Sequence, residues 1–259
     1  MTQVDDFVNV TLLALLQGVA EFLPISSSGH LVIGQHLLGI REAGMRLDVF
    51  LHAGTLISVM VFYRKTILRL LLGKEWALLL KIFVSSLPAV AVYFAFRERI
   101  DAMFENARMV GALLMFTGGI LAGTRFIPKG KKDVSFLRAL WMGAMQAVAL
   151  LPGVSRSGMT LAAARAGAVD PEKSAEFSFL MSMPLILGGV LLEVIEMFGG
   201  NAVGQDGGIG WTELLWGMAL ASVVGYVSLA VLIKALKGRW FWLFGPYCFA
   251  AGLATVWFL

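Results

Sequence analysis

Apolar residues run along this chain in long blocks separated by short polar connections, rather than with the period of a half-exposed helix or strand. A helix needs about 20 mainly apolar residues to cross the hydrocarbon core of a bilayer. Six segments reach or approach that length and predict transmembrane helices, namely residues 47–63, 76–96, 109–126, 175–198, 211–236 and 240–259.

Two further apolar regions, residues 7–40 and 136–169, do not fit a single span. Each is long enough for two helices but is broken in its middle by Pro, Gly and Ser. The backbone at such a break must lie against protein or water, because lipid offers no hydrogen-bond partners.

The charges of the connections predict the orientation of the spans. Residues 64–74 hold four Lys or Arg and no acid, and residues 125–138 hold five against one Asp. Both connections are therefore expected on the cytoplasmic side, together with the basic turn at residues 234–239. The acidic connection 199–213 and the balanced connection 97–108 are expected outside.

This orientation fixes how the two broken regions run. The acidic N-terminus is expected outside, so region 7–40 starts and finishes on the outer side, and region 136–169 starts and finishes on the inner side. Two re-entrant hairpins that enter from opposite faces of the membrane would each start and finish on the same side. Pairs of short full spans would do so as well, and they are kept as the structural alternative.

The two broken regions also resemble each other in sequence. Gln17 precedes the first serine of Ser26-Ser27-Ser28-Gly29 by nine positions, and Gln146 precedes Ser155-Arg156-Ser157-Gly158 by the same number. A shared pattern inserted from opposite sides indicates an inverted repeat, whose site lies where the broken helices meet. We therefore predict an all-α polytopic protein forming one membrane domain, 1–259. Repeat one covers about 1–124, repeat two about 128–238, and a final helix covers about 240–259.

Composition supports a membrane protein and excludes other classes. Of 259 residues, 58% are hydrophobic and 15% are charged, whereas soluble domains have roughly 45–50% and 25%. The same values exclude disorder. Cys248 is the only cysteine, which excludes a disulfide framework within the chain. The net charge of +4 is spread over short loops, so no nucleic-acid partner is expected.

The breaks carry polar groups in regions otherwise suited to lipid. Serines at these positions favour helix N-caps, and capping is the simpler interpretation of them. However, ionisable groups at membrane depth are expensive and usually functional. The first break and the helix before it supply Gln17, Glu21, Ser26, Ser27, Ser28 and His30, and the second supplies Ser155, Arg156, Ser157 and Thr160.

Arg156 stands between two serines at the expected start of a helix. The first amides of a helix are unpaired, the helix dipole is positive there, and guanidinium binds phosphate through a planar fork. This pattern favours an anion site. Arg156 can instead neutralise Glu21 as a buried pair, and that alternative stays open.

Together the motifs Gln17-x-x-x-Glu21, Leu23-Pro-Ile-Ser-Ser-Ser-Gly-His30 and Leu151-Pro-Gly-Val-Ser-Arg-Ser-Gly-Met-Thr160 resemble those of the undecaprenyl pyrophosphate phosphatase family, which is linked to bacitracin resistance. The resemblance extends over essentially the whole chain. It implies an enzyme of the bacterial cytoplasmic membrane that converts a C55 polyprenyl diphosphate lipid to the monophosphate and inorganic phosphate. That reaction recycles the carrier for peptidoglycan and other envelope polymers. The family's acidic motif allows Glu or Gln at its first position, and here it is Gln17.

Phosphoanhydride hydrolysis needs a nucleophile, neutralisation of the phosphoryl charge and protonation of the leaving group. Ser27 is the best-placed hydroxyl nucleophile, with Glu21 or His30 as its base. His30 attacking directly, or protonating the leaving phosphate, remains an alternative. Arg156, with Ser155, Ser157 and Thr160, is expected to hold the diphosphate. Gln17, Ser26 and Ser28 are further candidate substrate contacts.

The resemblance also implies a divalent cation, Mg²⁺ or Ca²⁺, which suits oxygen ligands, and Glu21 is its expected protein ligand. His36 and His52 are interpreted as structural. The active site is expected to open to the outer face. A homodimer is one of the oligomeric states that the sequence leaves open.

A second class of function fits the inverted repeat equally well. A transporter or flippase of an anionic lipid or small anion needs Arg156 but has little use for a base and a nucleophile. Glu21, Ser27 and His30 therefore favour the enzyme.

Overall fold

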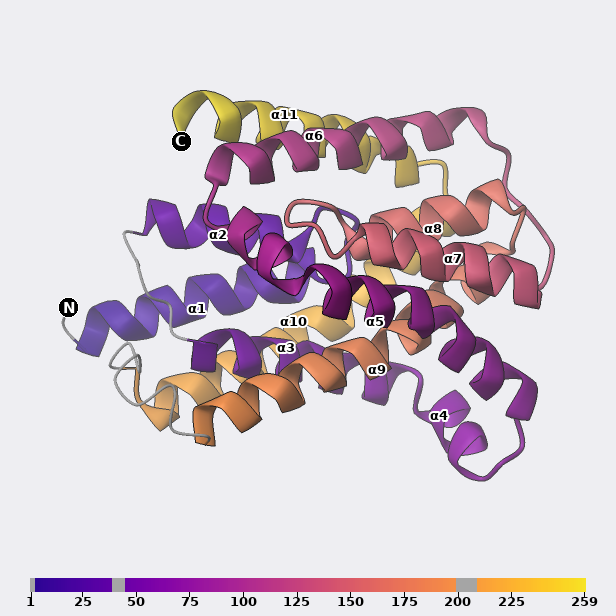
Figure 1. Cartoon of the computed structure of the whole chain (residues 1–259), viewed down its shortest axis with the longest axis horizontal. Coiled ribbons are helices and arrows are strands. Elements are labelled where there is room, and N and C mark those ends of the chain that lie inside the picture. The colour runs from indigo at the N-terminus through magenta and orange to yellow at the C-terminus, as the bar shows by residue number, and fades with distance from the viewer. Residues whose placement is uncertain (1–2, 39–44, 199–208) are drawn as a thin grey trace.

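The computed structural model describes residues 3–38, 45–198 and 209–259 (Figure 1). Within these ranges the chain is helical, and its one β-type pairing is an isolated bridge between Lys132 and Val169. The α-helices are α1 (Gln3–Ala20), α2 (Ser27–Leu37), α3 (Met45–Phe62), α4 (Arg64–Leu71), α5 (Trp76–Phe104), α6 (Ala107–Gly123), α7 (Phe136–Val148), α8 (Arg156–Ala166), α9 (Pro171–Phe198), α10 (Trp211–Lys237) and α11 (Phe244–Phe258). Two short 3₁₀ helices are η1 (Thr124–Phe126) and η2 (Phe241–Leu243). The all-α membrane fold is thereby confirmed.

Five helices among the described residues are long and apolar enough to cross a membrane, namely α5, α6, α9, α10 and α11. The sixth predicted span, residues 47–63, corresponds to α3, which passes the same test only together with α4. The two are bent by 82° at a break after Phe62. Because α4 begins with Arg64 and Lys65, its charges favour a position along the membrane surface. Most of the predicted connection 199–213 lies outside the described residues, as do residues 39–40.

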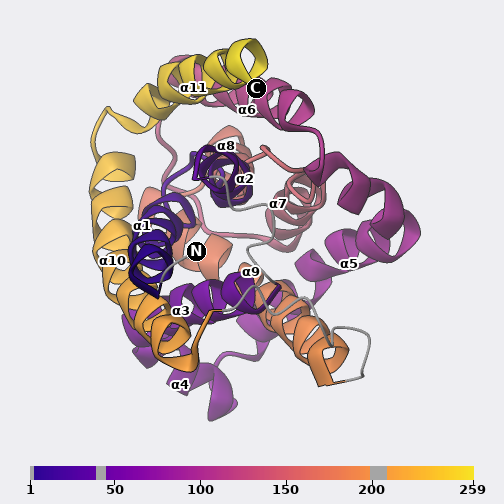
Figure 2. The ribbon, with the colours of Figure 1, turned by 90° about the vertical axis from the view of Figure 1, so that its left-hand side faces the viewer.

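The two broken regions form hairpins. Figure 1 shows α1 and α2 entering from one end of the molecule, α7 and α8 entering from the other, and their turns meeting near the centre. α2 and α8 have 11 residues each, so each is about 16 Å long and too short to cross a bilayer. Viewed along the molecule, α2 and α8 lie inside a ring of longer helices (Figure 2). These features fit re-entrant hairpins rather than pairs of full spans.

Close backbone contact holds the two turns together. A Cβ atom on Gly29 would lie 3.1 Å from the Cα atom of Gly153, and Gly153 has a φ of +92°, a conformation that favours glycine. Thr117 of α6 fixes the second turn, because its hydroxyl donates to the carbonyl of Gly153 at 3.0 Å and accepts from the amide of Ser155 at 3.1 Å. These two polar backbone groups of the second turn are thus satisfied by protein.

The helix contacts follow an approximate twofold pattern. α1 packs on α10 as α7 packs on α5, and α3 packs on α10 as α9 packs on α5. α6 and α11 pack on each other, at a distance so short that a Cβ on Gly118 would lie 2.7 Å from the amide of Phe249. In this pattern α11 is the counterpart of α6, although the sequence left the last helix outside both repeats. The repeat boundaries themselves stay a prediction.

Candidate active site

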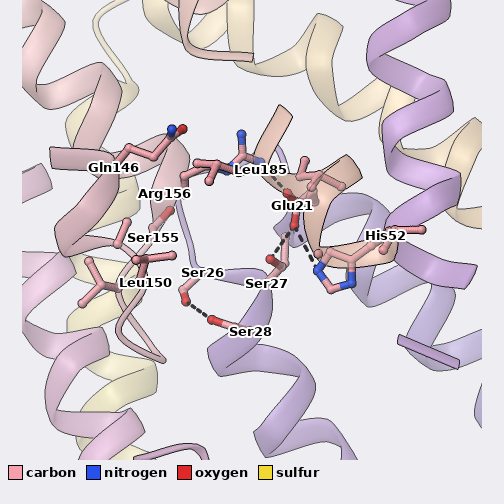
Figure 3. A pocket seen from close by; sticks show the side chains of 16 residues that line it. Glu21, Ser26, Ser27, Ser28, His52, Gln146, Leu150, Ser155, Arg156 and Leu185 are labelled. Carbon is pink, nitrogen blue, oxygen red and sulfur yellow. Dashed lines mark hydrogen bonds and ion pairs between the residues drawn. The ribbon is translucent and has the colours of Figure 1, made fainter. Parts of the chain in front are cut away.

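A cavity of about 260 Å³ lies where the two hairpin turns meet (Figure 3). Both turns, α3 and the end of α7 supply its polar lining, whereas α9 supplies an apolar wall. The polar lining residues are Glu21, Ser26, Ser27, Ser28, His52, Gln146, Ser155 and Arg156. The wall includes Leu185, Ile186 and Val190. The cavity therefore joins a polar floor to an apolar side.

The Glu21 carboxylate is the centre of the polar network. Its Oε1 accepts a hydrogen bond from Nη2 of Arg156, and its Oε2 accepts one from the Ser27 hydroxyl at 2.6 Å. Gln17 donates to Oε2 at 3.3 Å, and Nε2 of His52 lies 4.0 Å from the same oxygen. The Glu21 side chain is 6% exposed, so this carboxylate depends on protein partners rather than water.

The Arg156–Glu21 ion pair is the alternative that the sequence analysis left open, and it is present. It does not use the whole guanidinium, because Nη1 of Arg156 is buried and has no hydrogen-bond partner among the described residues. Both polar atoms of the Gln146 side chain are likewise buried without a partner. Each unpartnered buried donor or acceptor costs about 1–3 kcal/mol. A bound anion in this cavity offers acceptor oxygens to Nη1 of Arg156 and to Nε2 of Gln146.

The first serine of each motif caps its helix. Ser26 Oγ accepts from the amide of Gly29 at 3.3 Å, and Ser155 Oγ accepts from the amide of Gly158 at 3.1 Å. The capping interpretation therefore holds for these two residues. Because the cavity is lined at the starts of both α2 and α8, the positive ends of two helix dipoles adjoin the same space.

Of the two candidate bases for Ser27, Glu21 is hydrogen-bonded to it, whereas His30 bonds to other groups. Its Nδ1 lies 2.9 Å from the carbonyl oxygen of Ser26, and its Nε2 lies 2.8 Å from the hydroxyl of Tyr247, on which its ring stacks. His30 does not line the cavity. The physical reason is helical geometry: the side chain leaves α2 toward α11, and Glu21 takes the Ser27 hydrogen bond.

Three more predicted contacts lie behind the cavity lining. Gln17 bonds to Glu21, and the Ser157 hydroxyl donates to the carbonyl of Leu23 at 3.3 Å. The Thr160 hydroxyl lies 2.6 Å from that of Ser178 in α9. Gln17 thus bonds within its own hairpin, Ser157 joins the two hairpins, and Thr160 joins α8 to α9. Direct contact of these residues with a substrate stays a prediction.

Sequence reasoning missed two lining residues, His52 and Gln146. His52 was interpreted as structural because it is a lone histidine in an apolar segment, and no local pattern connects it with Glu21, 31 positions away. Gln146 had a usable signal. It precedes its turn by the same number of positions as Gln17, so the internal repeat alone could have identified it as a candidate site residue.

The described residues offer few ligands for the divalent cation that the sequence led us to expect. No group of three or more His, Cys, Asp or Glu side chains that could hold a metal occurs among the described residues. Among those lining the cavity, Glu21 carries the only carboxylate. A cation here would need most of its oxygen ligands from a bound diphosphate.

The fold and the cavity define a polytopic helical membrane protein with a pocket between two opposed re-entrant hairpins, lined by Arg156 and by the starts of α2 and α8. The chain belongs to the family described as bacitracin resistance protein BacA, whose model matches residues 10–254. A relative from Desulfosudis oleivorans, named undecaprenyl-diphosphatase, is 38% identical over 95% of this chain and 96% of its own length.

Relatives in other bacteria carry the same name. The protein from Desulforapulum autotrophicum is 37% identical over 94% of this chain and 95% of its own length. The one from Salinibacter ruber is 36% identical over 96% and 97%. This similarity spans both hairpins and the helices around them.

The Glu21–Arg156 pair predicts coupled stability. Arg156→Gln leaves a buried carboxylate without its counter-charge, which is expected to cost about 3 kcal/mol and to lower the melting temperature of the purified protein. In Glu21→Gln/Arg156→Gln no charge is left unpaired, so the double variant should melt above Arg156→Gln. Thermal unfolding in detergent measures both. Strictly additive losses would mean that the two side chains are not coupled.

Proposed function

We propose that this chain hydrolyses undecaprenyl diphosphate to undecaprenyl phosphate and inorganic phosphate. The names of its relatives and its family support this substrate, and the cavity offers the chemistry that the reaction needs. The product is the lipid carrier that is reused in peptidoglycan synthesis, which agrees with the bacitracin resistance in the family's description.

The single observation that carries the mechanism is the 2.6 Å hydrogen bond from the Ser27 hydroxyl to Glu21. Glu21 takes the hydroxyl proton while Ser27 Oγ forms a bond to the terminal phosphorus. The bond between that phosphorus and the bridging oxygen breaks, and its electron pair leaves with the polyprenyl phosphate, which takes up the proton from Glu21. Glu21 then accepts a proton from a water molecule whose oxygen attacks the phosphorus of the phosphoserine. The bond between that phosphorus and Ser27 Oγ breaks, inorganic phosphate is released, and Ser27 Oγ takes the proton from Glu21.

We assign binding of the diphosphate headgroup to buried donors that have no hydrogen-bond partner within the protein. Nη1 of Arg156 and the amide of Gln146 can donate to phosphoryl oxygens, and the amide-rich starts of α2 and α8 add positive potential. The same donors stabilise the charge that moves onto the oxygens during transfer. The apolar wall from Leu185 to Val190 gives the polyprenyl chain a path out of the cavity.

A transporter of an anionic lipid remains the second candidate, and the inverted repeat is the observation that favours it. The two differ in what Ser27 and Glu21 must do. An anion carrier does not need a hydroxyl bonded to a buried carboxylate, whereas a hydrolase depends on it.

Ser27→Ala is expected to reduce phosphate release from undecaprenyl diphosphate by about a thousandfold or more, because the nucleophile is lost. The assay uses purified protein in detergent with Mg²⁺ or Ca²⁺ present. Ser228→Ala is the matched control, because that hydroxyl bonds to the carbonyl of Val224 within α10 and does not line the cavity.

Either of two outcomes would contradict this proposal. If the unmodified chain released no phosphate, the hydrolase proposal would be rejected and the transporter favoured. Release by Ser27→Ala at more than a tenth of the original rate would move the attack to water or to His30.

We further propose that a divalent cation, Mg²⁺ or Ca²⁺, binds together with the substrate, with Glu21 as its protein ligand. Its contribution is to neutralise charge on the diphosphate. Chelation with EDTA is expected to abolish turnover, and added Mg²⁺ or Ca²⁺ to restore it. Direct titration of the cation by calorimetry should give weak binding without substrate. Full turnover in excess EDTA would end the cation proposal.

We also propose that the protein lies in the bacterial cytoplasmic membrane with the active site open to the outer side. The basic connections at residues 64–74 and 125–138 support this orientation. A membrane-impermeant maleimide should label Glu105→Cys in intact cells but Lys131→Cys only after lysis, since both positions are exposed and one precedes α6 whereas the other follows it. The reverse pattern would invert the topology. The homodimer stays a prediction.

A further inference from the structure

A second cavity, of about 610 Å³, lies at the end of the molecule where α6 and α8 finish and η2 begins. It is remote from the hairpin turns, because α8 runs from the active-site cavity to this end (Figure 1). Four cationic side chains line it, together with one indole, and no carboxylate does: Arg125, Lys129, Arg165, Arg239 and Trp242.

Three of these cations are held in place by neighbouring groups. The guanidinium carbon of Arg125 lies 4.6 Å from the centre of the Trp242 ring, a cation–π contact that leaves its N–H edge for other partners. Nε of Arg165 donates to the carbonyl of Ile127 at 2.8 Å, and Nζ of Lys129 donates to the carbonyl of Lys237. Each contact uses part of a cation and neutralises none of its charge.

Other Lys and Arg side chains at this end of the molecule form ion pairs with carboxylates. At the same end of the molecule Lys173 pairs with Asp133, Lys237 pairs with Glu172, and Arg69 pairs with Glu75. Within the described residues none of the four cations in the cavity pairs with a carboxylate. Like charges gathered around one concave surface repel one another, and no carboxylate of the described residues offsets this repulsion. An anion bound there would reduce the repulsion.

An apolar groove of about 540 Å³ adjoins this cavity through the segment 239–243. Arg239 and Trp242 face the basic cavity, whereas Trp240 and Leu243 line the groove with Phe244. Trp240 and Leu243 are exposed, as is usual for side chains that contact lipid near the membrane interface. Segment 239–243 thus contributes side chains to both the basic cavity and the groove.

We propose that the basic cavity binds the phosphate group of an anionic membrane lipid, one of whose chains lies in the adjoining groove. Inorganic phosphate satisfies the four cations equally well, but it makes no use of the groove. The groove is the reason for committing to a lipid. This site goes beyond the hydrolase activity and shares no lining residue with the active-site cavity.

The test compares lipids retained by the full-length protein. Protein released from nanodiscs with equal amounts of phosphatidylglycerol and phosphatidylcholine is examined by native mass spectrometry. The unmodified chain should retain phosphatidylglycerol preferentially. Arg125→Gln/Arg239→Gln should lower its retention about tenfold or more, since each surface cation contributes about 1 kcal/mol to anionic-lipid binding.

Lys65→Gln/Lys74→Gln is the matched control, because it removes two charges from the same basic end outside the cavity. It should retain phosphatidylglycerol normally. Lys129→Gln/Arg239→Gln replaces the first variant if that one fails to fold. Phosphate release in detergent is measured in parallel and should be unchanged in all variants, which separates this proposal from the hydrolase proposal.

Three results would overturn the proposal. The unmodified chain could show no preference for phosphatidylglycerol. The control could lose as much lipid as the cavity variant, which would indicate general surface attraction. Inorganic phosphate could bind, by calorimetry, and displace no lipid, which would make the cavity a site for the free anion.

Discussion

The buried carboxylate of Glu21 and the partly buried guanidinium of Arg156 join the two halves of this membrane protein. They are 135 positions apart in sequence, and each belongs to a turn that interrupts an otherwise apolar region. Neither charge can be left alone at membrane depth, because neither water nor lipid would solvate it there. The pair therefore requires the two turns to meet, and the cavity is the space that remains beside it.

Approximate symmetry builds the scaffold, and departures from symmetry supply the chemistry. Ser26 and Ser155 occupy equivalent places and make equivalent caps, so both halves present the start of a helix to the cavity. At the next position one half has Ser27 and the other has Arg156. The first half thereby provides a hydroxyl next to a carboxylate, and the second provides a cation. The two equivalent turns therefore line one cavity with two chemically different sides.

Much of the fold was predictable because the bilayer restricts what an apolar sequence can form. Span length, loop charge and broken hairpins follow from hydrogen bonding and solvation along the chain itself. The helix α4 and its bend of 82° from α3 were not predicted, since the sequence indicated only a basic connection after residue 63. The pairing of α11 with α6 was also missed, because it depends on contacts between helices far apart in sequence.

For the candidate site, the sequence by itself determined which ionisable and hydroxyl groups lie at the breaks, and hence that Glu21, Ser27 and Arg156 needed partners. Only the tertiary structure decided how they are paired. It turned His30 toward Tyr247, brought His52 to 4.0 Å from Glu21, and left the Gln146 amide buried and unpartnered. The physical reason is that the free-energy cost of burying a side chain can be judged from the apolar segment in which it lies. The partners of that side chain, by contrast, depend on how helices far apart in sequence pack together.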